Sequence, residues 1–172
     1  PIVTLHHFEL PLSLVKKYGG WRNRKLVELS VRYAKTVMER YRNKVKYWMT
    51  FNEINNLGGY AQMGTHRQDS QTRYQAVHHM FVASAKAVIA GHEINPNFKI
   101  GCMLIYPTTY AATCNPEDQI MMRNKMLNTF YYGDVHVRGR YTNTCTSLLH
   151  KHGVEIKMEP GDEELLAKGK VD

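Results

Sequence analysis

The sequence predicts an α/β fold with a parallel sheet. Three apolar runs, residues 2–8, 46–51 and 98–106, have the length and composition of buried strands. Amphipathic helical patterns separate these runs. Because parallel strands need a crossover connection, this alternation predicts successive βα units. No dinucleotide-binding glycine fingerprint or P-loop follows any of the runs, which disfavours a nucleotide-binding sheet.

The first half of the chain gives two strands separated by a helix. Pro11 stops the first strand, and residues 13–20 form a short turn and helix that Gly19 and Gly20 close. From residue 22 to about residue 43, apolar side chains recur every three or four positions, which predicts one amphipathic helix. Its expected inward positions are Leu26, Leu29, Tyr33, Val37 and Tyr41.

The second half predicts a helix over residues 70–90 with Gly91 as its C-cap, then the third strand, which Pro107 ends. Asn115 and Pro116 are typical of an N-cap and a first helical position, so a helix is expected from residue 115 to about 132. Further helices are expected over 134–152 and 162–167, and residues 170–172 resemble the start of another strand. The helix over 70–90 has its inward positions at Tyr74, Val77, Phe81, Ala85 and Val88.

Length and composition indicate one globular domain. The chain has 172 residues, of which 43% are hydrophobic and 22% charged. It contains no apolar run long enough to span a bilayer, so no membrane association is expected. The N-terminus has no signal-peptide pattern and resembles the inside of a longer chain. Three cysteines without metal-like spacing indicate free thiols, which favours a cytoplasmic location.

The net charge of +8 raises the question of a nucleic-acid partner. The basic residues are spread over segments 16–17, 22–25, 40–46 and 168–170, and no nucleic-acid fold signature accompanies them. Solvated helix faces on part of a larger protein therefore explain the charge better than nucleic-acid binding. An anionic small substrate remains the open alternative.

Polar side chains follow two of the predicted strands. His7 ends the first strand, and Asn52 and Glu53 follow the second. A carboxyl group at the end of a buried strand lies partly in the core and partly at a pocket, where it can be kept protonated and used as a proton donor. In a (β/α) barrel, chemistry is placed at this edge of the sheet.

Three motifs carry a resemblance to a known family. They are HFELP at residues 7–11, GGW at 19–21 with Tyr33-Ala34, and WMTFNE at 48–53. Together they resemble glycoside hydrolase family 1, the β-glucosidases built on a (β/α)8 (TIM) barrel. The segments 54–56 (INN), 101–104 and 114–118 are similar to its 6-phospho-β-glucosidase branch. The resemblance covers essentially the whole chain.

The resemblance implies roles for the three polar residues. Glu53 matches the general acid/base, Asn52 the residue that hydrogen-bonds the sugar 2-hydroxyl, and His7 the imidazole that hydrogen-bonds another glycone hydroxyl. The implied reaction is retaining hydrolysis of a small 6-phospho-β-glucoside, such as phosphorylated cellobiose or an aryl or alkyl β-glucoside. No metal and no cofactor are implied. Action on unphosphorylated β-glucosides or β-galactosides is the alternative.

The sequence also departs from the family. The nucleophile's motif, Thr-Glu-Asn-Gly on the seventh strand, does not occur, and the residues that bind the sugar 6-phosphate would lie later still. The chain therefore resembles about strands three to six of an incomplete barrel, with residues 1–172 as a single partial catalytic domain. We expect it to be inactive alone, and to self-associate through exposed barrel edges or to fold only with partners.

Several other residues have both a structural and a functional explanation. Tyr47 and Trp48 suit the core better than a sugar platform, whereas Tyr106 could pack or line the site. The histidine pairs 78–79 and 150/152 lack a third ligand at workable spacing, so solvated helix positions are expected rather than a metal site.

Overall fold

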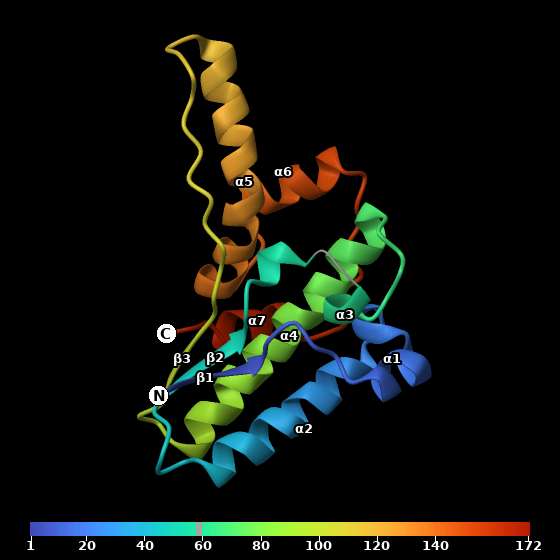
Figure 1. The fold of residues 1–172 in the computed structure, drawn as a ribbon, viewed down its shortest axis with the longest axis vertical. Coiled ribbons are helices and arrows are strands. Elements are labelled where there is room, and N and C mark those ends of the chain that lie inside the picture. Colours follow the sequence, from blue (N-terminus) through green and yellow to red (C-terminus); the bar gives the residue numbers. More distant parts are fainter. Residues whose placement is uncertain (58–59) are drawn as a thin grey trace.

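The computed structural model describes residues 1–57 and 60–172, and contains a parallel sheet backed by helices (Figure 1). The strands β1 (Ile2–His6), β2 (Tyr47–Phe51) and β3 (Lys99–Gly101) lie in the order β1-β2-β3. Ile2 pairs with Tyr47, and Tyr47 pairs with Lys99. The predicted parallel α/β fold is confirmed, and the carboxyl ends of the strands meet at one edge of the sheet.

The helices that connect the strands carry most of the core. α2 and α4 pack against each other, and α4 also contacts β2. Within the described part of the chain, every helix is too short or too polar to cross a bilayer. The helical elements are α1 (Leu12–Tyr18), η1 (Gly20–Arg22), α2 (Lys25–Arg40), η2 (Ile54–Asn56), α3 (Tyr60–Met63), α4 (Ser70–Ile94), α5 (Pro116–Arg138), α6 (Asn143–Lys151) and α7 (Asp162–Lys168).

The long helix α4 confirms its predicted inward face but not its predicted end. All five expected positions are buried. Gly91 lies inside the helix instead of capping it, and Asn95 is the C-cap. A Cβ at Gly91 would come within 2.3 Å of Ile100 Cδ1 and 3.0 Å of Met38 Sδ. The glycine therefore permits the close approach of α2 and β3 to α4.

The helix α2 differs from its prediction in start and in orientation. Gly20–Arg22 form the separate turn η1, so α2 begins at Lys25. Leu26 is buried as predicted, but the buried stripe continues through Ala34 and Met38. Tyr33 and Tyr41 are 52% and 44% exposed instead of inward. Close packing on α4 at Gly91 selects the narrow Ala34–Met38 stripe over the bulky tyrosines, which explains the rotation.

The segment after β3 is less regular than predicted. β3 ends at Gly101, and the chain then runs extended along α5 in an arm that projects from the body (Figure 1). Asn115 caps α5 as expected, since its side chain accepts a hydrogen bond from the Glu117 N–H at 3.0 Å. α5 continues through Gly133 to Arg138, so the predicted break near residue 133 is wrong. Gly139, with φ 64°, ends the helix instead.

The last residues lie beside β3 without forming a strand within the described chain. The Asp172 N–H donates to Ile100 O at 3.0 Å, and the Val171 N–H donates to His136 O at 3.2 Å. The Ile100 N–H also donates to Asp172 Oδ2 at 2.7 Å, so the expected strand at residues 170–172 is limited to Asp172 beside β3. The segment occupies the next position of the sheet, as a further βα unit would.

Four histidines are withdrawn from water, which makes the fold sensitive to acid. Burial lowers the pKa of His6 and of His136 to about 4, and burial also lowers the pKa values of His78 and His79. The unfolded chain binds protons on these groups below about pH 6.5, while the folded chain does not. The stabilising contribution of these neutral histidines is therefore complete above pH 6.5 and is lost as the pH falls towards 4.

We expect the free energy of unfolding to fall steadily between pH 6.5 and 4. His136 alone should contribute about 3 kcal/mol of this loss, which corresponds to its pKa shift. Urea unfolding at several pH values measures the slope, and His136→Asn, which cannot titrate, should make it shallower. An unchanged slope in that variant would contradict the assignment.

The amino ends of β1 and β2 carry an exposed apolar pair. Ile2 is 63% exposed and its partner in the register, Tyr47, is 48% exposed, so Tyr47 is not the core residue that was predicted. Trp48 is buried and belongs to the core, as predicted. A neighbouring apolar pair on an open sheet is a surface on which copies can associate.

The isolated 172-residue chain is therefore expected to self-associate in solution. Size-exclusion chromatography with light scattering should show a mass that rises with protein concentration. Tyr47→Lys should reduce the association, whereas Tyr110→Lys, on the projecting arm, should not. A monomer at all concentrations would refute this expectation.

Candidate active site

Glu53 lies where β2 ends, on a sharp backbone turn. Its φ of 43° and ψ of 53° place it in the left-handed region, which residues other than glycine rarely adopt. Phe8, just beyond the end of β1, also has a positive φ, of 68°. Such backbone strain persists where surrounding structure holds it and is common at functional sites. Two adjacent strands therefore end in strained turns at the same edge.

Asn52 and Glu53 are held by hydrogen bonds to their surroundings. The Asn52 N–H donates to His6 O at 2.9 Å, which places the ends of β1 and β2 side by side. Asn52 is 5% exposed. Glu53 is half-buried, and its Oε2 accepts a hydrogen bond from Asn56 Nδ2 at 3.0 Å. The carboxyl group thus has a fixed polar neighbour and an accessible side.

The two neighbouring histidines have opposite surroundings. His6 packs against Trp21 and Phe51, and Trp21 Nε1 donates to His6 Nε2 at 3.5 Å. His7 is exposed and lies edge-on to the Phe8 ring. This difference agrees with the expected alternation of side chains along a strand. His7, Asn52 and Glu53 therefore share the edge of the sheet at which β1 and β2 end.

A pair of asparagines fixes the turn that carries Glu53. Asn55 Nδ2 donates to Ile105 O at 2.7 Å, and the Ile105 N–H donates to Asn55 Oδ1 at 3.0 Å. This amide bracket fastens η2 to the segment after β3, while Asn56 bonds Glu53 itself. Sequence reasoning used residues 54–56 only as a mark of the family branch and missed this role. The signal for this role in the sequence is the pair of adjacent asparagines after a strand, because each amide group can both donate and accept a hydrogen bond.

Tyr106 follows Ile105 and packs against α5. Its ring lies 6.2 Å from the Phe130 ring of α5, and it is 54% exposed. Glu9, the acid that follows β1, lines a separate apolar pocket with Leu10 and Tyr33. Glu53, Asn52 and His7 thus bring a carboxyl group, an amide and an imidazole to this edge, a set suited to proton donation and hydroxyl binding.

The histidine pair 78–79 is placed differently from its prediction. Both side chains are buried, and the expectation of solvated positions is wrong for this pair. His78 Nε2 lies 2.9 Å from Asp162 Oδ2, and His79 Nδ1 lies 2.8 Å from Trp21 O. His150 and His152 are exposed, as expected. Within residues 1–57 and 60–172, no group of three or more potential ligands could hold a metal ion.

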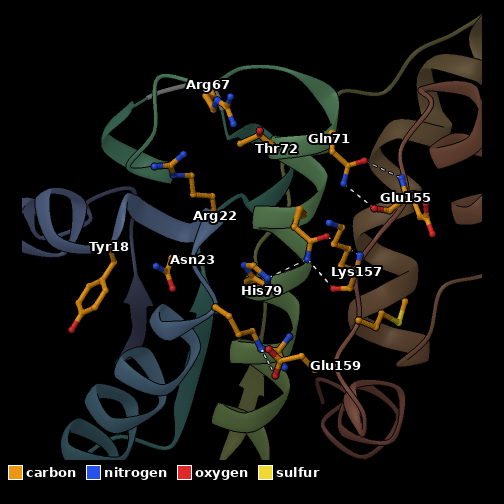
Figure 2. A pocket seen from close by; sticks show the side chains of 13 residues that line it. Tyr18, Arg22, Asn23, Arg67, Gln71, Thr72, His79, Glu155, Lys157 and Glu159 are labelled. Atoms are coloured by element: carbon orange, nitrogen blue, oxygen red, sulfur yellow. Dashed lines mark hydrogen bonds and ion pairs between the residues drawn. The ribbon is translucent and has the colours of Figure 1, made fainter.

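A hollow of about 750 Å³ lies away from Glu53 on the helical side of the molecule (Figure 2). Gln71 and Gln75 of α4 reach across it to an extended segment. Each amide donates to a backbone carbonyl and accepts from the same residue's N–H, Gln71 with Glu155 and Gln75 with Lys157. These four hydrogen bonds hold residues 155–157 against α4. They lie away from the edge of the sheet that carries Glu53.

The chain resembles a known enzyme family over its whole length. The sequence model of glycosyl hydrolase family 1 matches residues 1–172. The chain is 49% identical to the aryl-phospho-β-D-glucosidase BglH of Bacillus subtilis and 46% identical to a 6-phospho-β-glucosidase of Clostridium longisporum. It covers 38% and 37% of those proteins, which cover 100% and 97% of the chain.

The same relation holds for solved structures. A β-glucosidase from Exiguobacterium marinum superposes with a TM-score of 0.82 at 30% identity, over 97% of this chain and 39% of that one. A β-glucosidase from Exiguobacterium antarcticum gives 0.83 at 29% identity, over 97% and 39%. The three strands and their helices therefore form part of a (β/α)8 barrel. The chain spans less than two fifths of the length of these relatives.

Proposed function

This chain belongs to glycosyl hydrolase family 1, and on that premise we propose that the polypeptide carrying it, here called the parent enzyme, hydrolyses 6-phospho-β-glucosides with retention of configuration. Residues 1–172 form a single partial catalytic barrel domain within it. The observation that carries the proposal is Glu53, held at the end of a parallel barrel strand with its carboxyl bonded to Asn56. Relatives named for phospho-β-glucosides, at 41–49% identity, support the substrate class.

The reaction uses Glu53 twice. Its protonated carboxyl gives a proton to the glycosidic oxygen as the bond from that oxygen to the anomeric carbon breaks. A second carboxylate, supplied by the parent enzyme outside residues 1–172, bonds to the anomeric carbon and forms a glycosyl-enzyme intermediate. Glu53, now a carboxylate, takes a proton from water, and the resulting hydroxide displaces the second carboxylate. The sugar leaves and Glu53 is again protonated.

Two side chains orient the sugar in this scheme. Asn52 is nearly buried beside Glu53, and its amide bonds the 2-hydroxyl next to the reacting carbon. Hydrogen bonds to that hydroxyl strengthen in the transition state. His7 is exposed at the end of β1 and bonds another hydroxyl of the same ring. Neither step needs a metal or a cofactor.

The glycone is tested by comparing two substrates on the parent enzyme. p-Nitrophenyl β-glucoside 6-phosphate should be hydrolysed with a higher kcat/KM than plain p-nitrophenyl β-glucoside. The reverse order would assign the enzyme to unphosphorylated β-glucosides or β-galactosides. That alternative has its own support, because the solved structures that this chain resembles at about 30% identity are β-glucosidases.

The 172-residue chain alone should not turn over either substrate, because a retaining mechanism needs a second carboxyl group about 5 Å from the first. The family's nucleophile motif is absent from its sequence. An assay at high protein concentration checks this expectation. Turnover that Glu53→Gln abolishes would show instead that one of the chain's own acids serves as nucleophile.

A further inference from the structure

A second pocket, of about 520 Å³, lies behind the turn that carries Glu53. Its walls come from α4, from α5 and from residues 55–56 of η2. Among the described residues that line it, the charged side chains are Arg73 and Lys125, and no carboxylate is present. The larger groove of Figure 2 differs, because two carboxylates, those of Glu155 and Glu159, lie among its cations. The smaller pocket therefore has an uncompensated positive charge.

The two cations come from different helices. Arg73 is half-buried in the first turns of α4 and lines the pocket together with Tyr132 of α5. Burial raises the pKa of Tyr132 to about 12, so the phenol keeps its proton at neutral pH. The protonated phenol can donate a hydrogen bond to a ligand in the pocket. Lys125, on α5, is exposed and free to turn towards a ligand in the pocket.

Neutral groups complete the lining. Asn55 and Asn56 line the pocket from η2, and Thr129 lines it from α5. A guanidinium, an ammonium and several neutral donors around one hollow favour a multivalent oxyanion, since charge-assisted hydrogen bonds are the strongest available here. The volume accommodates more than a single inorganic ion.

We propose that this pocket, named here the Arg73–Lys125 pocket, binds a small phosphate-bearing molecule. The site is separate from the one at which His7, Asn52 and Glu53 would hold the glycone. It shares one residue with the catalytic turn, because Asn56 lines the pocket and also bonds Glu53 Oε2. An anion bound in the pocket can therefore contact Asn56, which positions the Glu53 carboxyl group.

Calorimetric titration of the parent enzyme tests the proposal without requiring turnover. The probes are inorganic phosphate and glucose 6-phosphate, which distinguish a free ion from a sugar phosphate as the ligand. Arg73→Gln and Lys125→Gln should each raise the Kd of the bound probe about tenfold or more, as expected for the loss of a charged hydrogen bond. Arg123→Gln is the matched control, since Arg123 is exposed on the same helix and does not line the pocket.

The titrations distinguish binding in this pocket from binding elsewhere on the enzyme. Binding that weakens in both pocket variants and persists in the control supports the site. Binding of neither probe, or binding that Lys125→Gln leaves unchanged, overturns it, because such binding belongs to another site. Lys125 is exposed and its variant keeps the fold, so it decides the question even if Arg73→Gln disturbs Tyr132. A normal pattern of substrate hydrolysis with no pocket binding would refute this proposal while leaving the catalytic one intact.

Discussion

Glu53→Gln in the parent enzyme is expected to lower kcat by about a thousandfold on substrates with alkyl or sugar leaving groups. General acid catalysis by a positioned side chain contributes roughly 10²–10⁴-fold, and a glutamine cannot supply the proton. The amide keeps the shape of the side chain and can still accept from Asn56. The loss should therefore appear in kcat rather than in folding or binding.

The size of the effect should depend on the leaving group. A p-nitrophenolate leaves without much help from an acid, so the glycosylation step with an aryl substrate should be less impaired than with phosphorylated cellobiose. The kcat/KM values for the two substrates measure the difference, because they report the steps up to glycosylation and not the release of the sugar. An equal loss of kcat/KM on the two, or no loss, would show that Glu53 is not the acid. Glu9→Gln is the matched control, because Glu9 follows β1 but lines a different pocket.

The features that the sequence predicts well are local. Strand β2 and the motif at its end lie within residues 46–56, where an apolar run stops at Asn52 and Glu53. The inward face of α4 and the Asn115 cap of α5 follow from spacing and from capping chemistry alone. The assembly of His7 with Asn52 and Glu53 also follows, because parallel strands place their carboxyl ends together.

The features that it does not predict depend on contacts between distant residues. Gly91 has the composition of a C-cap, and only the approach of Ile100 and Met38 explains why it lies inside α4. The same approach turns α2 away from its apparent apolar face. His78 resembles a surface histidine because its partner Asp162 is 84 positions away. Local periodicity contains no information about such pairs.

Asp162 provides the second large expected effect, on stability. It is 1% exposed and accepts hydrogen bonds from the Arg24 guanidinium on both oxygens, from His78 Nε2 at 2.9 Å and from the Glu159 N–H at 2.9 Å. Burial acts to raise the pKa of Asp162, but Arg24, Glu159 and His78 together lower it to about 2. His78 stays neutral because burial lowers its pKa, and its Nδ1 lies 3.0 Å from the Tyr141 hydroxyl.

This network joins elements that are far apart in the chain. Arg24 precedes α2, His78 lies in the middle of α4, and Asp162 opens α7. Because the folded-state pKa of Asp162 is lowered, its stabilising contribution is present above about pH 4 and is lost as the pH falls through about 2. At neutral pH the contribution is complete.

Asp162→Asn should therefore destabilise the parent enzyme by about 3–5 kcal/mol, the usual cost of removing one partner of a buried ion pair. Thermal unfolding followed by circular dichroism should show a melting temperature lower by several degrees. The matched control is Glu28→Gln, because Glu28 pairs with Lys25 on the surface of α2, where the two side chains are 65% and 48% exposed. Its effect should stay within about 1 kcal/mol. Equal effects in the two variants would contradict the argument.

A second substitution identifies the cause of the loss. If Asp162→Asn acts by leaving the Arg24 guanidinium without its carboxylate, then Arg24→Met should cost less in the Asp162→Asn background than in the wild type. Arg24 is 22% exposed, so its charge is partly withheld from water and cannot be fully solvated when unpaired. Additive losses would indicate instead that Asp162 acts through its bonds to His78 and Glu159. The double-mutant cycle thus decides whether Asp162 stabilises the fold through its ion pair with Arg24 or through its hydrogen bonds to His78 and Glu159.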